Sequence, residues 1–336
     1  MKFGLFLSVQ HPVGDDMATH FDEHIEQVKA LRKHGFASAW AGQHYLTTDY
    51  QMLHNVPLLA RVAADVGSMT VGTGIILLPL HNPVDLAEQM ATLDTICHGN
   101  FVFGVGIGYR EVEMQAFNLT LKDRARRFEE VLTLIKKLWT EPSVTFHGKY
   151  FRYENFVMNL RPYQKPMPPI WIAANSDDAV RRAAVMGDAW ILNPHATLST
   201  LERQMKIYRE TLKENGKRLP KELPIIKELY VAENDERALK EVAPFLDQKY
   251  KVYVHWGQHK ALPSDDQLAK PFDELRKDRF IIGSPDTCID EIDKHRKHLG
   301  VNHFIFRIQW SGMKPSAILK EIGTIGKKII PYFKGK

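Results

Sequence analysis

Short apolar runs alternate with amphipathic segments along the whole chain. Residues 2–8 form the first run, and apolar side chains from Phe21 to Leu31 follow it at a spacing of three or four residues. This spacing is typical of one face of a helix, which Gly35 would end. The first 35 residues therefore predict one strand followed by one helix.

The same order recurs to the end of the chain. Further strands are expected at residues 36–41, 70–77, 101–105, 168–175, 189–193, 224–232 and 303–310. Further helices are expected around residues 56–66, 83–96, 124–139, 178–186, 201–208, 235–255, 287–298 and 316–330. About eight strands that alternate with helices favour a closed (β/α)₈ TIM barrel over an open doubly wound sheet. We expect residues 1–336 to form one such α/β domain.

Two insertions interrupt the alternation. Residues 141–168 are rich in Tyr, Phe and Pro, and residues 255–282 contain PSDDQ and DELRKDR. Both are too long for ordinary connections between a strand and a helix. The second insertion is our candidate for a lid over one end of the barrel, and a disordered surface excursion is the alternative.

Composition limits the class of protein. With 44% hydrophobic and 25% charged residues, the chain has the make-up of a soluble enzyme or binding protein. Its apolar runs are shorter than the roughly 18 residues that a membrane span needs, and no signal-like start is present, so we expect a cytoplasmic protein without a membrane partner. The net charge of +5 is scattered, which argues against a nucleic-acid partner. Cys97 and Cys288 lack metal-type spacing and are expected to be plain thiols.

In a TIM barrel the functional site lies at the carboxyl ends of the strands, so polar residues at those positions are the candidates for it. His44 follows the second strand in the stretch FASAWAGQHY. The other strand ends supply Ser8, Gln10, His11, Thr73, Gly74, Ile75, Gly106, Gly108, Tyr109, Asn175, Ser176, Asn193, His195, Arg307, Gln309 and Trp310. This set lacks the HxH pair or carboxylate cluster of a hydrolytic metal site, and we expect no metal.

Several of these residues suit a flat, phosphorylated ligand. Glycines at positions 72, 74, 104, 106 and 108 would let a ring system approach the backbone closely, although barrel curvature explains them equally well. Asn175 and Ser176 precede a helix and could face a phosphate, or Ser176 could simply cap the helix. Arg127 could pair with the phosphate or remain solvated. GVGIG at residues 104–108 is not a dinucleotide fingerprint, because it lacks the last glycine.

The chain resembles the bacterial luciferase-like family of flavin-dependent monooxygenases nearly from end to end. The resemblance is carried by KFGLFL, GFASAWAGQHY, VGTGIILLPLHNPVDLAEQMATLD, GNFVFGVGIGYREVEMQAF, RRFEEVLTLIKKLW, VTFHGKYF, PPIWIAANS and IGSPDTCI. It implies a TIM barrel that holds flavin mononucleotide (FMN), or in one branch the deazaflavin F420, at the carboxyl ends of its strands.

The resemblance also implies roles for single residues. His44 matches a histidine near the reactive ring, and Gly74 and Ile75 match a pair joined by a cis peptide bond beneath the ring. The cofactor-binding residues implied with them are Thr73, Gly106, Glu113, Arg127, Asn175 and Ser176. We expect His11, Tyr109, His195 and Trp310 to shape the substrate pocket. Two departures, Gln43-His44-Tyr45 after strand 2 and Ile107 in place of a phosphate-binding arginine, argue against light emission.

Three hypotheses for function follow. The first is a monooxygenase in which reduced FMN reacts with O₂ and one oxygen atom passes to a small organic substrate, with His44 as the catalytic residue. The chain lacks a nicotinamide-binding motif, so a separate flavin reductase would supply the reduced flavin. The second is an F420-dependent reductase or dehydrogenase, and the third is a flavin-binding protein without turnover. The resemblance implies a homodimer or a family-type heterodimer, and the substrate stays open.

Overall fold

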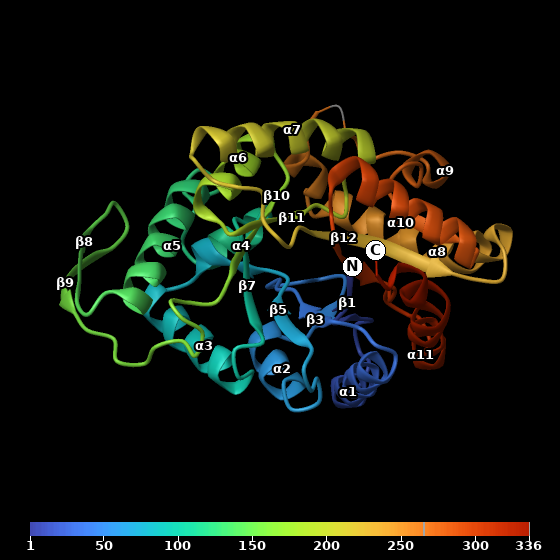
Figure 1. Ribbon diagram of the computed structural model, residues 1–336, viewed down its shortest axis with the longest axis horizontal. Coiled ribbons are helices and arrows are strands. Elements are labelled where there is room, and N and C mark those ends of the chain that lie inside the picture. The colour runs from blue at the N-terminus through green and yellow to red at the C-terminus, as the bar shows by residue number, and fades with distance from the viewer. Residues whose placement is uncertain (265, 336) are drawn as a thin grey trace.

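Parallel strands close into a barrel in the computed structural model, which describes residues 1–264 and 266–335. The barrel strands are β1 (Lys2–Leu7), β3 (Ser38–Ala41), β5 (Thr70–Thr73), β7 (Phe101–Gly106), β10 (Ile170–Ala174), β11 (Ala189–Leu192), β12 (Pro224–Val231) and β14 (His303–Arg307). Their order around the barrel is β10-β11-β12-β14-β1-β3-β5-β7, and pairing of β7 with β10 closes it. The predicted (β/α)₈ TIM barrel is thus confirmed (Figure 1).

Helices surround the barrel, as Figure 1 shows. The main ones are α1 (Met17–Lys33), α2 (Asn55–Val62), α3 (Pro83–Ile96), α5 (Arg124–Thr140), α6 (Asp177–Met186), α7 (Leu198–Glu214), α8 (Asp235–His255), α10 (Pro285–Leu299) and α11 (Pro315–Thr324). Four helices are capped by side chains that accept hydrogen bonds from backbone N–H groups, namely those of Asp16, Asn82, Ser176 and Ser284. The short α4 (Glu111–Ala116) was not expected from the sequence, because six residues show too little periodicity.

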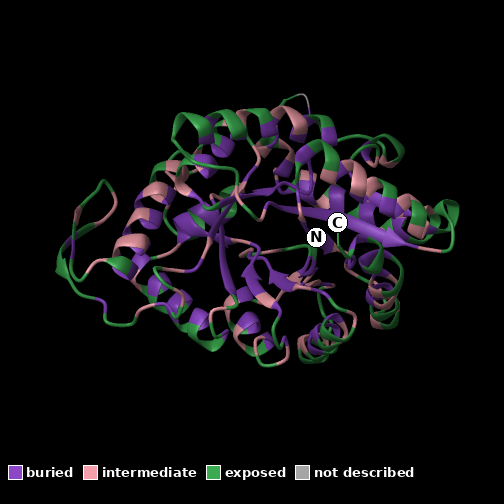
Figure 2. Cartoon of the chain, viewed as in Figure 1, coloured by how far each residue is buried: buried purple, intermediate pink, exposed green. Residues whose placement is uncertain are grey.

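The strands are buried on both faces, which is why the sequence shows them as continuous apolar runs (Figure 2). Inside the barrel Trp40 stacks on Trp171, with ring centroids 5.1 Å apart. Trp40 Nε1 donates to Ser38 Oγ, which is 2.7 Å from His303 Nε2. These large side chains fill the barrel interior, so a ligand has room only beyond them, at the carboxyl ends of the strands.

The two insertions adopt different structures. The first contains an antiparallel hairpin, β8 (Val144–His147) and β9 (Arg152–Phe156), that projects from the barrel (Figure 1). The second contains a 3₁₀ turn at Gln258–Ala261, the short α9 (Phe272–Leu275) and β13 (Ile281–Gly283), which pairs with β12. Residue 265 of the proposed lid lies outside the described residues. Leu262 and Leu268 pack in the same cluster as Tyr250 of α8.

Other expectations concern membranes, metals and thiols. Within residues 1–264 and 266–335, no helix is long and apolar enough to cross a membrane. The same residues contain no group of His, Cys, Asp and Glu side chains that could hold a metal ion. Cys97 and Cys288 are buried free thiols, as predicted. Burial raises the pKa of the Cys97 thiol to about 12.

Candidate functional site

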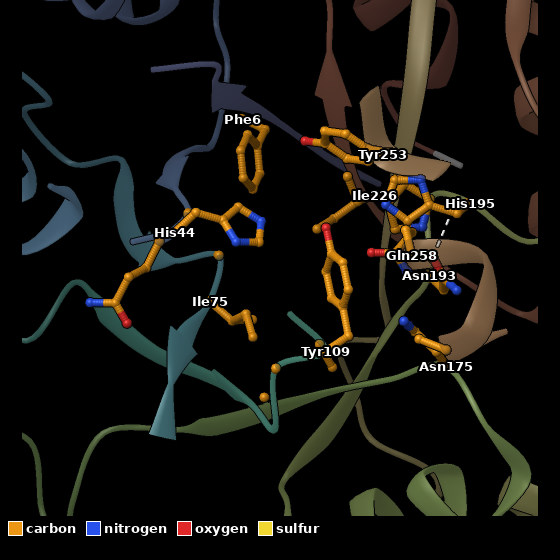
Figure 3. Close-up of a pocket in the computed structure, with 18 of the residues that line it drawn as sticks. Phe6, His44, Ile75, Tyr109, Asn175, Asn193, His195, Ile226, Tyr253 and Gln258 are labelled. Atoms are coloured by element: carbon orange, nitrogen blue, oxygen red, sulfur yellow. Dashed lines mark hydrogen bonds between the residues drawn. The ribbon is translucent and has the colours of Figure 1, made fainter. Parts of the chain in front are cut away.

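A cavity of about 260 Å³ opens at the carboxyl ends of the strands. Figure 3 shows His44 on one side, His195 and Tyr253 on the other, and Tyr109 between them. Thirteen residues were expected to have a catalytic, cofactor-binding or substrate-pocket role, and nine of them line this cavity. They are His44, Gly74, Ile75, Gly106, Tyr109, Asn175, Ser176, His195 and Trp310. Residues from strands far apart in the chain therefore meet at one site.

Thr73 lies behind the cavity wall rather than in it. Its Oγ1 donates to Gly104 O at 2.7 Å and accepts from Gly104 N at 2.8 Å, so it links β5 to β7. His11 also lies outside the cavity, which corrects its expected position. The short strand β2 (Gln10–His11) pairs with β4 (Gln51–Met52), and adjacent side chains of a strand face opposite ways. Gln10 faces the cavity, and His11 contacts His24 instead.

The position expected for Arg127 is corrected as well. Its Nε donates to Pro79 O at 2.6 Å, and its guanidinium lies 4.6 Å from the ring centroid of Phe151, outside the cavity. Arg124, almost one turn earlier on α5, lines the cavity and donates from Nη1 to Gly108 O at 3.2 Å. Burial lowers the pKa of the Arg124 guanidinium. Arg124 is thus the arginine that α5 contributes to the site.

His44 is held by a carboxylate from outside the cavity. Its Nδ1 is 2.9 Å from Oε1 of Glu113, which is fully buried on α4. The same oxygen accepts from Tyr45 N at 2.9 Å and from Arg110 Nη1 at 3.2 Å. Because a carboxylate only accepts, we assign the Nδ1 proton to His44. Nε2 then remains available on the cavity side.

Glycines give the wall between His44 and Asn175 a smooth surface. A Cβ on Gly106 would lie 2.2 Å from Ile75 Cδ1, and one on Gly42 would lie 2.8 Å from Gly74 O. Gly108 has φ +73°, a conformation that side chains disfavour. The peptide bond between Gly74 and Ile75 is cis, as the resemblance implies. A flat ligand can therefore approach the backbone here.

The wall formed by β12, β14 and α8 contains Lys249 and Glu228, which we did not predict, beside Arg307, which we expected at the end of its strand. Lys249 Nζ pairs with Oε1 of Glu228, and Trp310 Nε1 donates to Oε2 of Glu228 at 2.9 Å. Arg307 follows on β14 and lines the cavity with Lys249. The strand PIIKELYV does carry a signal, because Lys227 and Glu228 interrupt an apolar run that is buried throughout. Lys249 gives no such signal on its helix.

The second insertion reaches the mouth of the cavity. Gln258, Lys260, Ala261 and Leu262 line it together with Tyr253 of α8. Trp256 packs beside His44, with ring centroids 5.5 Å apart, and Arg110 lies over the Trp256 ring. The described part of this insertion therefore closes one side of the site.

The sequence profile described as luciferase-like monooxygenase matches residues 1–303. The chain is 27% identical to 4-hydroxyprotoasukamycin monooxygenase of Streptomyces nodosus subsp. asukaensis, over 100% of this chain and 93% of the relative. It is 24% identical to the oxygenase component of flavin-dependent trigonelline monooxygenase of Acinetobacter baylyi, over 99% and 96%. It is 27% identical to F420-dependent glucose-6-phosphate dehydrogenase of Segniliparus rotundus, over 84% and 87%.

Solved structures share the fold. The monooxygenase RslO1 of Streptomyces bottropensis superposes with a TM-score of 0.88 at 22% identity, covering 99% of this chain and 100% of that one. The oxygenating constituent of 3,6-diketocamphane monooxygenase of Pseudomonas putida, solved with FMN, gives 0.81 at 20% identity, with 98% of each chain covered. At these identities the likeness concerns the barrel alone.

Proposed function

The chain belongs to the luciferase-like monooxygenase family, and from this premise we propose that it is a flavin-dependent monooxygenase that uses reduced FMN. One observation carries the proposal: His44, held by the buried Glu113, faces a cavity whose adjoining wall is lined by glycines and leaves room for a flat ring. Bound reduced FMN would supply the electrons that activate O₂, so that one oxygen atom enters the substrate and the other leaves as water.

The residues around the cavity fit FMN. Ile75, Gly106 and Gly108 form the wall on which the ring would lie. Asn175, Ser176 and Arg124 line the cavity together and would hold the phosphate, since α6 begins there and the start of a helix favours an anion. Buried polar atoms without a hydrogen-bond partner in the described chain, among them Tyr109 Oη and Asn193 Nδ2, are available to the polar ring edge or to the substrate.

His44 would hold or pass a proton at Nε2. Glu113 fixes the ring orientation, because its Oε1 lies 2.9 Å from Nδ1 and accepts the hydrogen bond that this nitrogen donates. Tyr109 and Trp256 both contact the imidazole edge to face and would restrict water around it. A cavity with few waters protects the oxygen-transfer step from competing hydrolysis.

We further propose that reduced flavin comes from a separate reductase and that the protein acts as a dimer. The relative from Acinetobacter baylyi is described as an oxygenase component, which supports a reductase partner for this chain. The sequence offers no nicotinamide-binding motif of its own.

An F420-dependent reductase or dehydrogenase is the second candidate. Four cations, Arg124, Lys249, Lys260 and Arg307, line the cavity, and none of the described lining residues is a carboxylate. This charge also suits the acidic tail of F420, and one relative uses F420. Lys260 of the second insertion lines the cavity and would pair with such a tail.

Anaerobic titration with reduced FMN, and separately with reduced F420, tests the proposal through the fluorescence of Trp256 and Trp310. We expect reduced FMN to bind at least about tenfold more tightly than F420. Air is then admitted with a panel of alkenes, ketones and aldehydes, and incorporation of oxygen from ¹⁸O₂ is measured by mass spectrometry. Preference for F420, or FMN binding without oxygen incorporation, would reject the monooxygenase.

His44→Ala separates catalysis from binding. We expect oxygen incorporation to fall by about 100-fold, the usual contribution of a positioned acid or base, with FMN affinity kept. His298→Ala, at the exposed end of α10, is the matched control. Unchanged turnover in His44→Ala would show that the imidazole is only part of the wall.

A further inference from the structure

The wall formed by β12, β14 and α8 holds more positive charge than negative charge. Lys249 and Arg307 line the cavity there, and Glu228 is the carboxylate that lies between them. The Glu228 side chain is fully buried, whereas Lys249 is 8% and Arg307 12% exposed. Charges at this depth need partners, because burial removes most of their hydration.

Lys249 already has its partner. Its Nζ pairs with Glu228 Oε1, and Trp310 Nε1 takes the other oxygen at 2.9 Å. Both oxygens of Glu228 are therefore engaged before Arg307 is considered. This arrangement neutralises one of the two cations and fixes the Trp310 ring at the cavity wall.

Arg307 keeps unused donors. Its Nη1 lies 3.8 Å from Glu228 Oε1, too far for a hydrogen bond, and both Nε and Nη1 are buried without a hydrogen-bond partner in the described chain. The guanidinium lies 4.1 Å from the ring centroid of Phe6, which holds it flat against the wall. A second negative group is missing beside Arg307.

The neighbouring His195 is affected by the same excess of charge. Burial lowers the pKa of His195 well below its ordinary value, and the positive charges of Arg307 and Lys249 lower it further. A neutral imidazole cannot compensate Arg307. The missing negative group must come from a ligand.

We propose that Arg307 binds the carboxylate of a small organic acid, which is the substrate of the oxygenation proposed above. The planar guanidinium matches a carboxylate in shape and charge. Phe6 and Tyr253, which also line the cavity, would hold the apolar body of the acid. That this acid is the substrate rests on the proposed function. Binding of the acid to Arg307 requires no flavin.

The cofactor phosphate is the other anion that could reach Arg307, and the strand order favours the substrate. Asn175 and Ser176 follow β10, whereas Arg307 ends β14, three places further around the barrel. Arg124 contacts Gly108, which follows β7, the strand that pairs with β10. The two groups of cations thus serve separate anions.

Binding of carboxylates to the flavin-free protein tests the assignment. Acetate, hexanoate and benzoate are each compared with the matching amide by isothermal titration calorimetry. We expect at least one carboxylate to bind about tenfold more tightly than its amide, the value of one charge-assisted hydrogen bond. Arg307→Gln should abolish this preference, and Arg307→Lys, which keeps the charge but loses the planar fork, should retain part of it. Arg124→Gln should keep the preference for carboxylates and lower the affinity for FMN.

Several results would overturn the assignment. They are equal binding of acids and amides, no binding of any of the three acids, or a carboxylate preference that survives Arg307→Gln. Loss of FMN affinity in Arg307→Gln with none in Arg124→Gln would assign Arg307 to the cofactor phosphate. If Arg307→Gln does not fold, an unchanged preference in Arg307→Lys would reject the proposal. Failure of FMN to bind at all would reject the proposed function and leave the anion site standing.

Discussion

Replacing Glu113 by glutamine tests whether this carboxylate prepares His44 for proton transfer. Glu113 Oε1 accepts hydrogen bonds from His44 Nδ1, Tyr45 N and Arg110 Nη1. Its Oε2 has no partner in the described chain. The amide nitrogen of glutamine can take the place of Oε2 while the accepting oxygen stays. Glu113→Gln therefore removes a charge and keeps the shape of the side chain.

The expected loss in the free energy of unfolding follows from the three contacts of Glu113 Oε1. Hydrogen bonds to charged groups contribute about 1.5–3 kcal/mol and neutral ones about 0.5–1.5 kcal/mol, so each contact weakens by about 1 kcal/mol. Because the three contacts share one oxygen, we expect a total of about 2 kcal/mol rather than the full sum. For a chain of this size that loss lowers Tm by about 3 °C. If the imidazolium of His44 forms in the rate-limiting step, kcat falls about tenfold to 100-fold.

The assay is oxygen incorporation from ¹⁸O₂ with the compound that the unsubstituted protein converts fastest, together with thermal unfolding and FMN titration. Glu111→Gln is the control, because Glu111 lies on the same helix and is exposed. A fall in Tm with kcat unchanged would refute a role for Glu113 in positioning His44. Loss of FMN affinity alone would support the role that the resemblance implies, an influence on flavin binding.

Three further predictions concern the cofactor wall and pH. Arg124→Gln should weaken FMN binding by about tenfold or more, as loss of a charged contact does, whereas Arg127→Gln should leave it unchanged in fluorescence titration; the reverse result would contradict the placement of the two arginines. Gly106→Ala should push Ile75 into the space proposed for the flavin ring and weaken FMN binding in the same titration. Gly323→Ala should leave FMN binding unchanged, because its Cβ would meet nothing closer than 3.6 Å. Burial lowers the pKa of His24 to about 4 from 6.5, so the folded chain keeps it neutral while the unfolded chain takes up a proton below pH 6.5. The stability that is present above pH 6.5 is therefore lost as the pH falls toward 4. In calorimetry between these pH values, Tm should fall less steeply with pH in His24→Gln than in the unsubstituted protein.

The barrel could be predicted because its signals are local. Each barrel strand is buried on both faces and appears as an apolar run, and the helix from Pro83 to Ile96 agrees with its predicted bounds to the residue. The hairpin of residues 144–156 was missed, since its strands are only four and five residues long and largely exposed. The predicted helix at 316–330 is regular only to Thr324, after which π-helical and 3₁₀ turns follow.

From the pattern of strands, a site residue could be predicted only where it follows the end of a barrel strand. His44, Tyr109 and Asn175 follow barrel strands directly and line the cavity. The choice between Arg124 and Arg127 depends on the phase of a helix about its axis, which charged residues at its start do not determine. Lys249 reaches the site on α8, so its role depends on tertiary contacts alone. Glu113 was expected only from the resemblance, because its contact with His44 joins residues far apart in the chain.

Two histidines line the cavity, and their surroundings give them different capacities. His195 is fully buried, its Nδ1 lies 3.1 Å from Tyr250 Oη, and burial together with the charges of Arg307 and Lys249 lowers its pKa well below the ordinary value. It therefore stays neutral at the pH where such an enzyme works and cannot release a proton. His44 instead holds its Nδ1 proton against Oε1 of Glu113, which leaves Nε2 available to the cavity. This fixed orientation assigns proton transfer to His44, and the positive charge beside His195 leaves that wall to the anionic ligand.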